Sequence, residues 1–456
     1  GHAGEAHAAV NGDWQRSGRG GGHGRGMSQW GAYGAATQGL GAAAILAFYY
    51  PGTSLTGQPN TAIDVRLTTG RAGEVIVDAE PSMQLRWQDG TLPLPSAGTT
   101  GAILSWKLTS VSGGTQLWYV DAGTAVWRSY SFVPGTLAAF AAPDQGLRVV
   151  LDDFRRREYQ GTIGALKNAD GSLTTVNSVP LESYLRGVVP VEVSPSWPAA
   201  ALQAQAIAAR TYASQQRHQA RGETDICDTT ACQVYRGVAT YTIAGALQTQ
   251  HAAASTDAAI AATANQVLIT GGAFSYAFTQ FSASNGGWSV AGSAPYLTAK
   301  ADPYDGVLPQ APTTWTARIT TTAVRNAYPQ VGTPQRLTVL DRTGVGQWGG
   351  RVVQLRIEGT AGSVVVTGDA FRSALGLRST WWTTSTLAQP ASGLVTDVTG
   401  DGIADMWARE QGGGTLYFYP GLAGGSFGAG LALGNGWDMH DVLLSPGDVT
   451  GDGIPD

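Results

Sequence analysis

One block of helix-forming sequence lies between two long stretches of short strand patterns, and this order restricts the fold more than any other feature. Short alternating segments fill residues 61–160, separated by Gly, Pro, Asp and Ser turns. Alanine-rich helical patterns occupy residues 179–265, and strand patterns then return as far as residue 384. Because strands and helices are segregated, the sequence predicts an α+β fold, a mixed strand-rich domain with a helical subdomain.

Helix signals divide the central block into three helices. Residues 181–188 suit a short helix and residues 197–219 a long one. A third helix is expected from Ser255, with Ser255 or Thr256 as its cap. Near the start of the chain, the glycine-rich loop GRGGGHGRGMSQWGAYGAA precedes an Ala/Leu-rich helix that ends near FYYPG.

Composition restricts the classes of partner. The 456 residues suggest two or three domains. Only 13% of the residues are charged, against about 25% in average proteins, and the net charge of −5 argues against nucleic-acid binding. No apolar run reaches the ~18 residues of a membrane span. Low charge with abundant Thr, Ser, Gly, Trp and Tyr suits a secreted, strand-rich protein that handles polar uncharged polymers. The chain starts GHAGEAHAAV without an initiating Met, so we interpret it as a mature or trimmed chain.

The two cysteines, Cys227 and Cys232, lie close together in DICDTTACQVY. In an oxidising compartment they most simply form a local disulfide. Zinc is the alternative, but it would need two further ligands, and the nearest histidines in the sequence are His218 and His251.

The tail contains a repeat, DVTGDGIAD and later DVTGDGIPD, whose oxygen-bearing residues have the spacing of a calcium loop. An Asp-Gly-rich turn without metal is the alternative. A repeat of about 50 residues made of short strands is typical of propeller blades, so the tail resembles an incomplete β-propeller-like FG-GAP/VCBS calcium repeat. The expected Ca²⁺ ligands are Asp397, Thr399, Asp401 and Asp405 in the first loop, and Asp448, Thr450, Asp452 and Asp456 in the second.

A single carboxylate, Glu192, lies in the apolar tract VVPVEV. Desolvation by such neighbours should raise its pKa and keep it protonated near neutral pH. A protonated carboxylic acid is what cleavage of a glycosidic bond requires, because the leaving oxygen must receive a proton. The alternatives are a solvent-facing glutamate or one paired with Arg186.

Five segments together resemble the SpoIID/LytB family of bacterial sporulation and cell-wall proteins, over roughly residues 1–384. The resemblance implies a peptidoglycan protein, since some members are lytic transglycosylases and others enhance an amidase. The segments are GGHGRGMSQWGAYGAA, VPLESYLRGVVPVEV, SWPAAALQAQAIAARTYA, DICDTTACQVYRG and FTQFSASNGGWS.

The resemblance places the family's catalytic glutamate at Glu192 and implies further residues around the substrate. Trp30, Tyr184, Trp197 and Tyr235 are aromatics that can line a sugar groove, and a place in the core is their alternative. The expected substrate-binding residues are His23, Ser28, Gln29, Tyr184, Arg210, Tyr212, Gln233, Tyr235, Ser282, Ser284, Gly286 and Gly287.

Several of these residues keep an alternative role. His23 can make a substrate or structural hydrogen bond or ligate a metal, and Ser28 and Gln29 can instead cap the following helix. Arg210 can pair with an acid, orient Glu192 or bind a substrate N-acetyl or lactyl group. Glu182 is expected on a helix surface.

Three departures from the family pattern matter. The GHGxGMSQ loop usually closes the domain but here opens the chain, as in a circular permutation, so the fold must bring residues 19–35 beside Glu192. Ala231 stands where many relatives carry histidine, which weakens the zinc alternative. Gln203 replaces a common lysine, so one substrate contact is expected to differ.

The resemblance implies a division of the chain with a helical catalytic subdomain. We expect a permuted segment over 1–58, a β-rich part over 59–178, the catalytic core over 179–384, a linker over 385–393 and the calcium repeats over 394–456.

The implied reaction cleaves MurNAc–GlcNAc strands to 1,6-anhydro-MurNAc ends, with Glu192 as acid and then base and no catalytic cofactor. The alternatives are a non-catalytic peptidoglycan-binding protein that assists an amidase, and a calcium-dependent adhesion protein. In each case the protein is expected to be bacterial and either secreted or associated with the cell wall.

Overall fold

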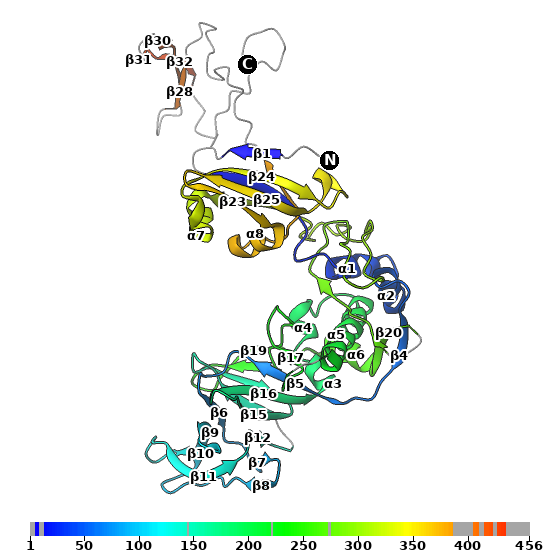
Figure 1. Ribbon diagram of the computed structural model, residues 1–456, viewed down its shortest axis with the longest axis vertical. Helices are drawn as coiled ribbons and strands as arrows, with labels where there is room; N and C mark the ends of the chain where they lie inside the picture. Colours follow the sequence, from blue (N-terminus) through cyan, green and yellow to red (C-terminus); the bar gives the residue numbers. More distant parts are fainter. Residues whose placement is uncertain are drawn as a thin grey trace.

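The computed structural model describes residues 5–8, 13–143, 146–219, 222–271, 275–385, 405–409, 415–422 and 426–434. This part of the chain is mixed and strand-rich, in agreement with the α+β prediction. Figure 1 shows a group of helices between a large strand-rich part and a smaller sheet, so the molecule curves around its helical centre. Among the described helices, none combines the length and apolar character needed to cross a bilayer.

Two large sheets form the strand-rich part. The first has the order β17 (Ile226–Cys227), β5 (Ala62–Leu67), β16 (Leu173–Pro180), β15 (Thr162–Lys167), β12 (Leu137–Ala141), β7 (Gln84–Trp87) and β8 (Gly90–Pro93). The second has the order β11 (Arg128–Pro134), β10 (Gly114–Asp121), β9 (Ile103–Val111), β6 (Glu74–Asp78), β13 (Leu147–Val150), β14 (Arg156–Tyr159), β18 (Ala239–Tyr241) and β19 (Leu247–Gln250).

Alternation along the strands creates the main core. In β5, Ile63, Val65 and Leu67 are buried, while Arg66, between Val65 and Leu67, is exposed, as the two-residue period of a strand requires. Buried side chains from both sheets join those of the central helices in one hydrophobic cluster. The core therefore anchors the helices directly to the sheets.

The central helices are α3 (Leu181–Leu185), α4 (Val189–Glu192), α5 (Ala199–Gln219) and α6 (Ala254–Ala262). The helix expected over 181–188 ends earlier, at Leu185, and after a turn Pro190 lies in the first turn of the separate helix α4. The cap predicted for the third helix is wrong: α6 has Ala253 at its N-cap, and the Ser255 hydroxyl donates to the Pro195 carbonyl instead.

The N-terminal segment packs on this helical centre. Its helices α1 (Gln29–Thr37) and α2 (Ala42–Tyr49) contact α5, where small side chains such as Ala204 and Ala208 allow close approach. The strand β4 (Ser54–Gly57) then joins β20 (Gln266–Thr270) and β21 (Ser275–Tyr276). The pair β3 (Met27–Ser28) and β22 (Phe281–Ser282) is parallel.

A third body unites the beginning of the chain with residues 314–385. The strand β2 (Asp13–Arg19) lies between β23 (Thr314–Thr320) and β27 (Trp382–Ser385). Next to it is the sheet β1 (Glu5–Ala8), β24 (Pro334–Arg342), β25 (Val352–Gly359) and β26 (Gly362–Thr367), with the helices α7 (Thr321–Ala327) and α8 (Gly368–Leu375). Buried Trp14, Phe371 and Trp382 join these elements in one hydrophobic cluster.

The described part of the tail is small. It consists of the sheet β28 (Met406–Arg409), β29 (Leu416–Tyr419) and β32 (Leu431–Gly434), and of the pair β30 (Gly421–Leu422) and β31 (Ser426–Phe427). Of the expected calcium ligands, only Asp405 is described, and it is buried. Asp397, Thr399, Asp401, Asp448, Thr450, Asp452 and Asp456 lie outside the described residues, so calcium binding stays a prediction.

Candidate active site

A cleft of about 760 Å³ lies where the three parts of the chain meet. Its walls come from the glycine loop, the helical centre, the segment after the disulfide, β22 and α8. The lining residues are Gly21, Gly22, His23, Gln29, Glu192, Tyr212, Thr230, Ala231, Cys232, Val234, Gln280, Phe281, Ser282, Ala283, Arg372, Ser373, Gly376 and Leu377. Among these described residues, Glu192 is the sole acid.

Glu192 is held at the end of α4, where buried Val188 and Val189 anchor the short helix in the core. Its Oε1 accepts a hydrogen bond from the Val234 amide at 3.1 Å, and its Oε2 accepts one from Gln29 Nε2 at 3.4 Å. Burial raises the pKa of Glu192, and these two hydrogen bonds act in the opposite direction. The carboxyl is thus desolvated but fixed in orientation.

The alternative in which Arg186 neutralises Glu192 is wrong. The Arg186 guanidinium donates to both carboxylate oxygens of Asp257, at 3.0 and 2.9 Å. Within the described residues, the ion pairs of the structure do not include Glu192. Its raised pKa is therefore not offset by a neighbouring cation.

The glycine loop lies against Glu192, because β3 pairs with β22 and carries Gln29 to the carboxylate. Gly26 has a φ of +64°, and a Cβ there would lie 2.0 Å from the Gln280 carbonyl, so glycine permits this close approach. Gln29 Nε2 also lies 3.4 Å from Gln205 Oε1. Gln205 is a buried residue of α5 that the motif comparison missed.

Ser28 has the capping role. Its hydroxyl accepts a hydrogen bond from the Gly31 amide at 3.0 Å at the start of α1, and its side chain is fully buried. Direct contact between Ser28 and a substrate in the cleft is therefore not supported.

His23 lies in the cleft as a neutral imidazole. Its Nδ1 accepts a hydrogen bond from the Arg25 amide at 2.9 Å, which leaves the proton on Nε2. Burial, and then the positive charges of Arg25, Arg351 and Arg372, lower the pKa of His23 to about 4. At neutral pH His23 can thus donate a hydrogen bond through Nε2.

This lowered pKa predicts an acid-sensitive contribution to stability. The unfolded chain protonates His23 near pH 6.5 and the folded chain only near pH 4, so stability should fall by about 3 kcal/mol as pH decreases between these values. His23→Gln should remove this component in chemical denaturation followed from pH 7 to 4. Exposed His218 provides the control His218→Gln, and equal pH dependence in wild type and His23→Gln would contradict the assignment.

Tyr184, Gln233 and Tyr235, which were expected to contact the substrate, are instead buried in the scaffold. The Tyr184 hydroxyl donates to Gln233 Oε1 at 3.1 Å, and Gln233 Nε2 donates to the Ala209 carbonyl at 3.1 Å. The Tyr235 hydroxyl donates to Asn177 Oδ1 at 2.8 Å. These residues connect the helices to the sheets beneath the cleft, because each polar group buried there needs a partner.

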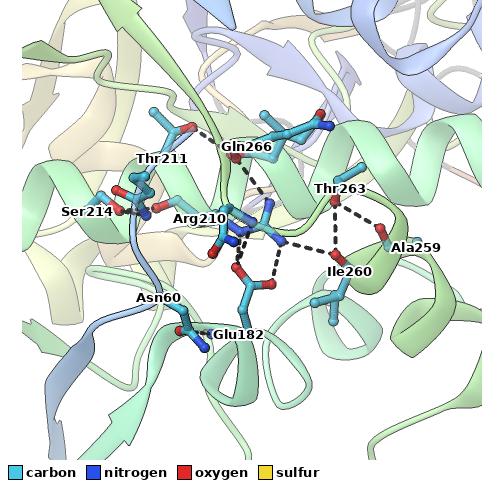
Figure 2. Close-up of polar contacts among 12 residues, drawn as sticks. Asn60, Glu182, Arg210, Thr211, Ser214, Ala259, Ile260, Thr263 and Gln266 are labelled. Atoms are coloured by element: carbon cyan, nitrogen blue, oxygen red, sulfur yellow. Dashed lines mark hydrogen bonds and ion pairs between the residues drawn. The ribbon is translucent and has the colours of Figure 1, made fainter. Parts of the chain in front are cut away.

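Arg210 is likewise a scaffold residue and does not contact Glu192. Figure 2 shows its guanidinium facing Glu182 and two backbone carbonyls. Its Nε and Nη2 lie 2.7 and 2.8 Å from the Glu182 carboxylate oxygens, and it also donates to the carbonyls of Gln266 and Ile260. Glu182, expected as a plain helix-surface group, is the fixed partner that the buried arginine requires.

The serines and glycines of β22 and of the segment after it lie against the glycine loop, through Ser282 with Gly24 and Ser284 with Gly21. Ser282 lines the cleft, and its Oγ accepts a hydrogen bond from the Gly24 amide at 3.1 Å. The Ser284 hydroxyl and the Gly286 amide both donate to Asp305 Oδ2, at 2.8 and 2.9 Å. Gly287 donates its amide to Asn285 Oδ1 at 2.9 Å. Of this group, only Ser282 reaches the cleft.

The cysteines form a disulfide, and the turn that it closes makes one wall of the cleft. Tyr212 also lines the cleft, and its ring stacks on Phe278 with the centroids 5.5 Å apart. Sequence reasoning missed Phe281, Arg372 and Ser373 as cleft residues. The last two come from α8, far from Glu192 along the chain, and no local pattern indicated their approach.

Residues 169–269, which include Glu192, match the family model described as SpoIID, Stage II sporulation protein. An uncharacterized protein of Brachyspira hyodysenteriae (strain ATCC 49526 / WA1) is 42% identical over 82 residues, or 18% of this chain and 22% of that protein. The amidase enhancer of Bacillus subtilis (strain 168) is 36% identical over 127 residues, or 26% of this chain and 15% of that protein. The SpoIID resemblance is thus confirmed for the segment that carries Glu192, while the chain spans less than a quarter of either relative.

Proposed function

We propose that this chain is a peptidoglycan lytic transglycosylase that cleaves MurNAc–GlcNAc glycan strands and leaves 1,6-anhydro-MurNAc ends. The observation that carries the proposal is Glu192 as the sole acid among the described cleft residues, desolvated and without a cationic partner. A glycosidase of the usual type needs two carboxylates at the scissile bond. One carboxylate suffices when the nucleophile belongs to the substrate.

In the proposed reaction, protonated Glu192 donates its proton to the glycosidic oxygen as the bond to C1 of the muramic residue breaks. The resulting carboxylate then takes the proton of the muramic 6-hydroxyl, whose oxygen attacks C1 and closes the anhydro ring. Hydrogen bonds from Gln29 and the Val234 amide stabilise the carboxylate between the two steps. In this proposal the His23 Nε2–H binds a sugar oxygen in the cleft, and Tyr212 and Phe281 contact the apolar faces of sugar rings.

The comparisons support the biological setting of this proposal. The matched family is named for sporulation, and one relative is named an amidase enhancer, so we infer a secreted or cell-wall-associated bacterial protein. The position of the glycine loop beside Glu192 supports a permuted order of the same domain. The paired DVTGDG loops support Ca²⁺ binding by the tail.

A second candidate is a non-catalytic glycan-binding protein that assists a cell-wall amidase, which the name of the Bacillus relative favours. A calcium-dependent adhesion protein is a third, and it would lose binding when calcium is removed.

Mass spectrometry of purified glycan strands after incubation with the chain distinguishes these candidates. We expect 1,6-anhydro-MurNAc ends, since the attacking oxygen belongs to the substrate. Reducing ends would indicate a hydrolase and overturn the proposal, and intact strands would favour the amidase-assisting protein. The same digestion with a calcium chelator should proceed unchanged, because the proposed reaction uses no metal.

A further inference from the structure

Three aromatic side chains lie in mutual contact beside the cleft: Trp30 and Tyr33 of α1 and Trp197, just before α5. The ring centroids of Trp30 and Tyr33 are 5.8 Å apart, those of Trp30 and Trp197 are 4.9 Å apart, and those of Tyr33 and Trp197 are 5.0 Å apart. All three side chains are only half-buried. We call this group the aromatic platform.

The platform lies beside the cleft, whose lining ends at neighbours of the platform residues in sequence and in hydrogen bonding. Trp30 directly follows Gln29, whose amide contacts Glu192, and the Trp30 amide donates to the carbonyl of the cleft residue Ala283 at 3.0 Å. Trp197 closes the turn that follows α4, where its amide donates to the Ser194 carbonyl at 3.0 Å. The segment that follows Glu192 and the segment that follows its contact Gln29 therefore each lead to a residue of the platform.

The platform is held rigidly although it is partly exposed. Trp197 packs against the main hydrophobic core, and α1 contacts α5. Ser28 fixes the first turn of α1 through its cap, one residue before Gln29. An aromatic surface fixed in this way can bind a ligand without a large loss of side-chain entropy.

A polymer bound across Glu192 must extend outside the cleft on both sides of the bond that is cleaved. The cleft volume of about 760 Å³ is within the range of about 300–1,000 Å³ typical of pockets for one small ligand. Hexose rings present an apolar C–H face whose partial positive charge suits the negative face of an aromatic ring. Their hydroxyls remain directed sideways to water.

We propose that the aromatic platform is a subsite that binds sugar rings of the glycan strand beyond the cleft. This inference rests on the proposed function, because it requires that a strand lies across Glu192. The platform stacks against the C–H faces of successive rings and increases affinity for long strands over short ones.

The test uses the full chain carrying Glu192→Gln, so that glycan remains intact while affinity is measured by calorimetry with MurNAc–GlcNAc oligosaccharides of increasing length. Adding Trp30→Ala and Trp197→Ala should weaken binding of long oligosaccharides about tenfold and leave that of a disaccharide unchanged. Trp30→Phe with Trp197→Phe should restore most of the affinity. The matched control is Trp127→Ala. Trp127 is a half-buried tryptophan that lies in the chain between β10 and β11 and does not line the cleft.

The outcomes separate the two proposals. Unchanged length dependence in the folded alanine variant overturns the platform subsite and leaves the proposed function intact. Loss of disaccharide and long-strand binding alike also overturns it, because the rings would then only support the cleft. If the Glu192→Gln chain binds no glycan of any length, both proposals fail. Thermal unfolding of each variant shows whether it is folded.

Discussion

Glu192→Gln should lower the rate of glycan cleavage by about 10²- to 10⁴-fold while the chain stays folded, because the amide cannot supply a proton to the leaving oxygen. Gln keeps the size of the side chain and one acceptor for the Val234 amide. The release of anhydro ends from purified strands measures the effect. Glu223→Gln, at an exposed carboxylate outside the cleft, is the control and should keep full activity.

The raised pKa of Glu192 adds a pH signature to this prediction. Cleavage by the wild type should persist above the usual pKa of glutamate and decline as pH rises through the raised value, since only the protonated form starts the reaction. The stability of the folded chain also decreases as pH rises. Below pH ~4.3 the buried acid is protonated in both states and its burial carries no charge penalty, and this advantage is lost as pH rises through the raised pKa of the folded group. Glu192→Gln should therefore gain stability relative to wild type at neutral pH and lose that advantage in acid.

Two outcomes would contradict the role of Glu192. Full cleavage by a folded Glu192→Gln chain would remove it from the chemistry. Loss of cleavage together with unfolding would leave its role structural, which the comparison of denaturation curves detects.

Local sequence patterns were sufficient to predict the desolvation of Glu192, but not the other residues of its cleft. The valines next to it are hydrophobic in any fold, so its desolvation could be predicted from neighbours in sequence. The approach of residues 19–35 to Glu192 was expected from the family resemblance alone, because nothing in GRGMSQ itself indicates a partner, and the parallel pairing of β3 with β22 was not predicted. The strand alternation in β5 and the long helix α5 also follow from periodicity that can be read locally.

The residues that sequence analysis misassigned all depend on contacts between distant segments. Tyr184, Gln233 and Tyr235 belong to motifs of the family, but only the packing of helices on sheets shows that they are buried. Arg372 reaches the cleft because β2 lies between β23 and β27 and brings α8 beside the glycine loop. A sequence motif therefore indicates residues that lie near one another, whereas the packing of distant segments determines which of them line the cleft.

Arg210→Met should destabilise the chain by about 3–5 kcal/mol, because it leaves the Glu182 carboxylate without its cation in a largely buried place. The side chain of Arg210 is 0% exposed and that of Glu182 is 20% exposed, so water compensates only partly. The variant also removes donors from the carbonyls of Gln266 and Ile260, which connect α5 to β20 and α6 (Figure 2). Urea denaturation of the full chain measures the change in free energy of unfolding.

The chain offers a matched control in Arg186, which pairs with Asp257 at 41% and 31% side-chain exposure. Arg186→Met should cost about 0–1 kcal/mol, since water screens an exposed pair. Replacing both partners, as Arg210→Met with Glu182→Leu, should recover much of the lost stability, because no buried charge is then left alone. A stable Arg210→Met chain with weakened glycan binding would instead return Arg210 to the substrate-contacting role that the family resemblance implies.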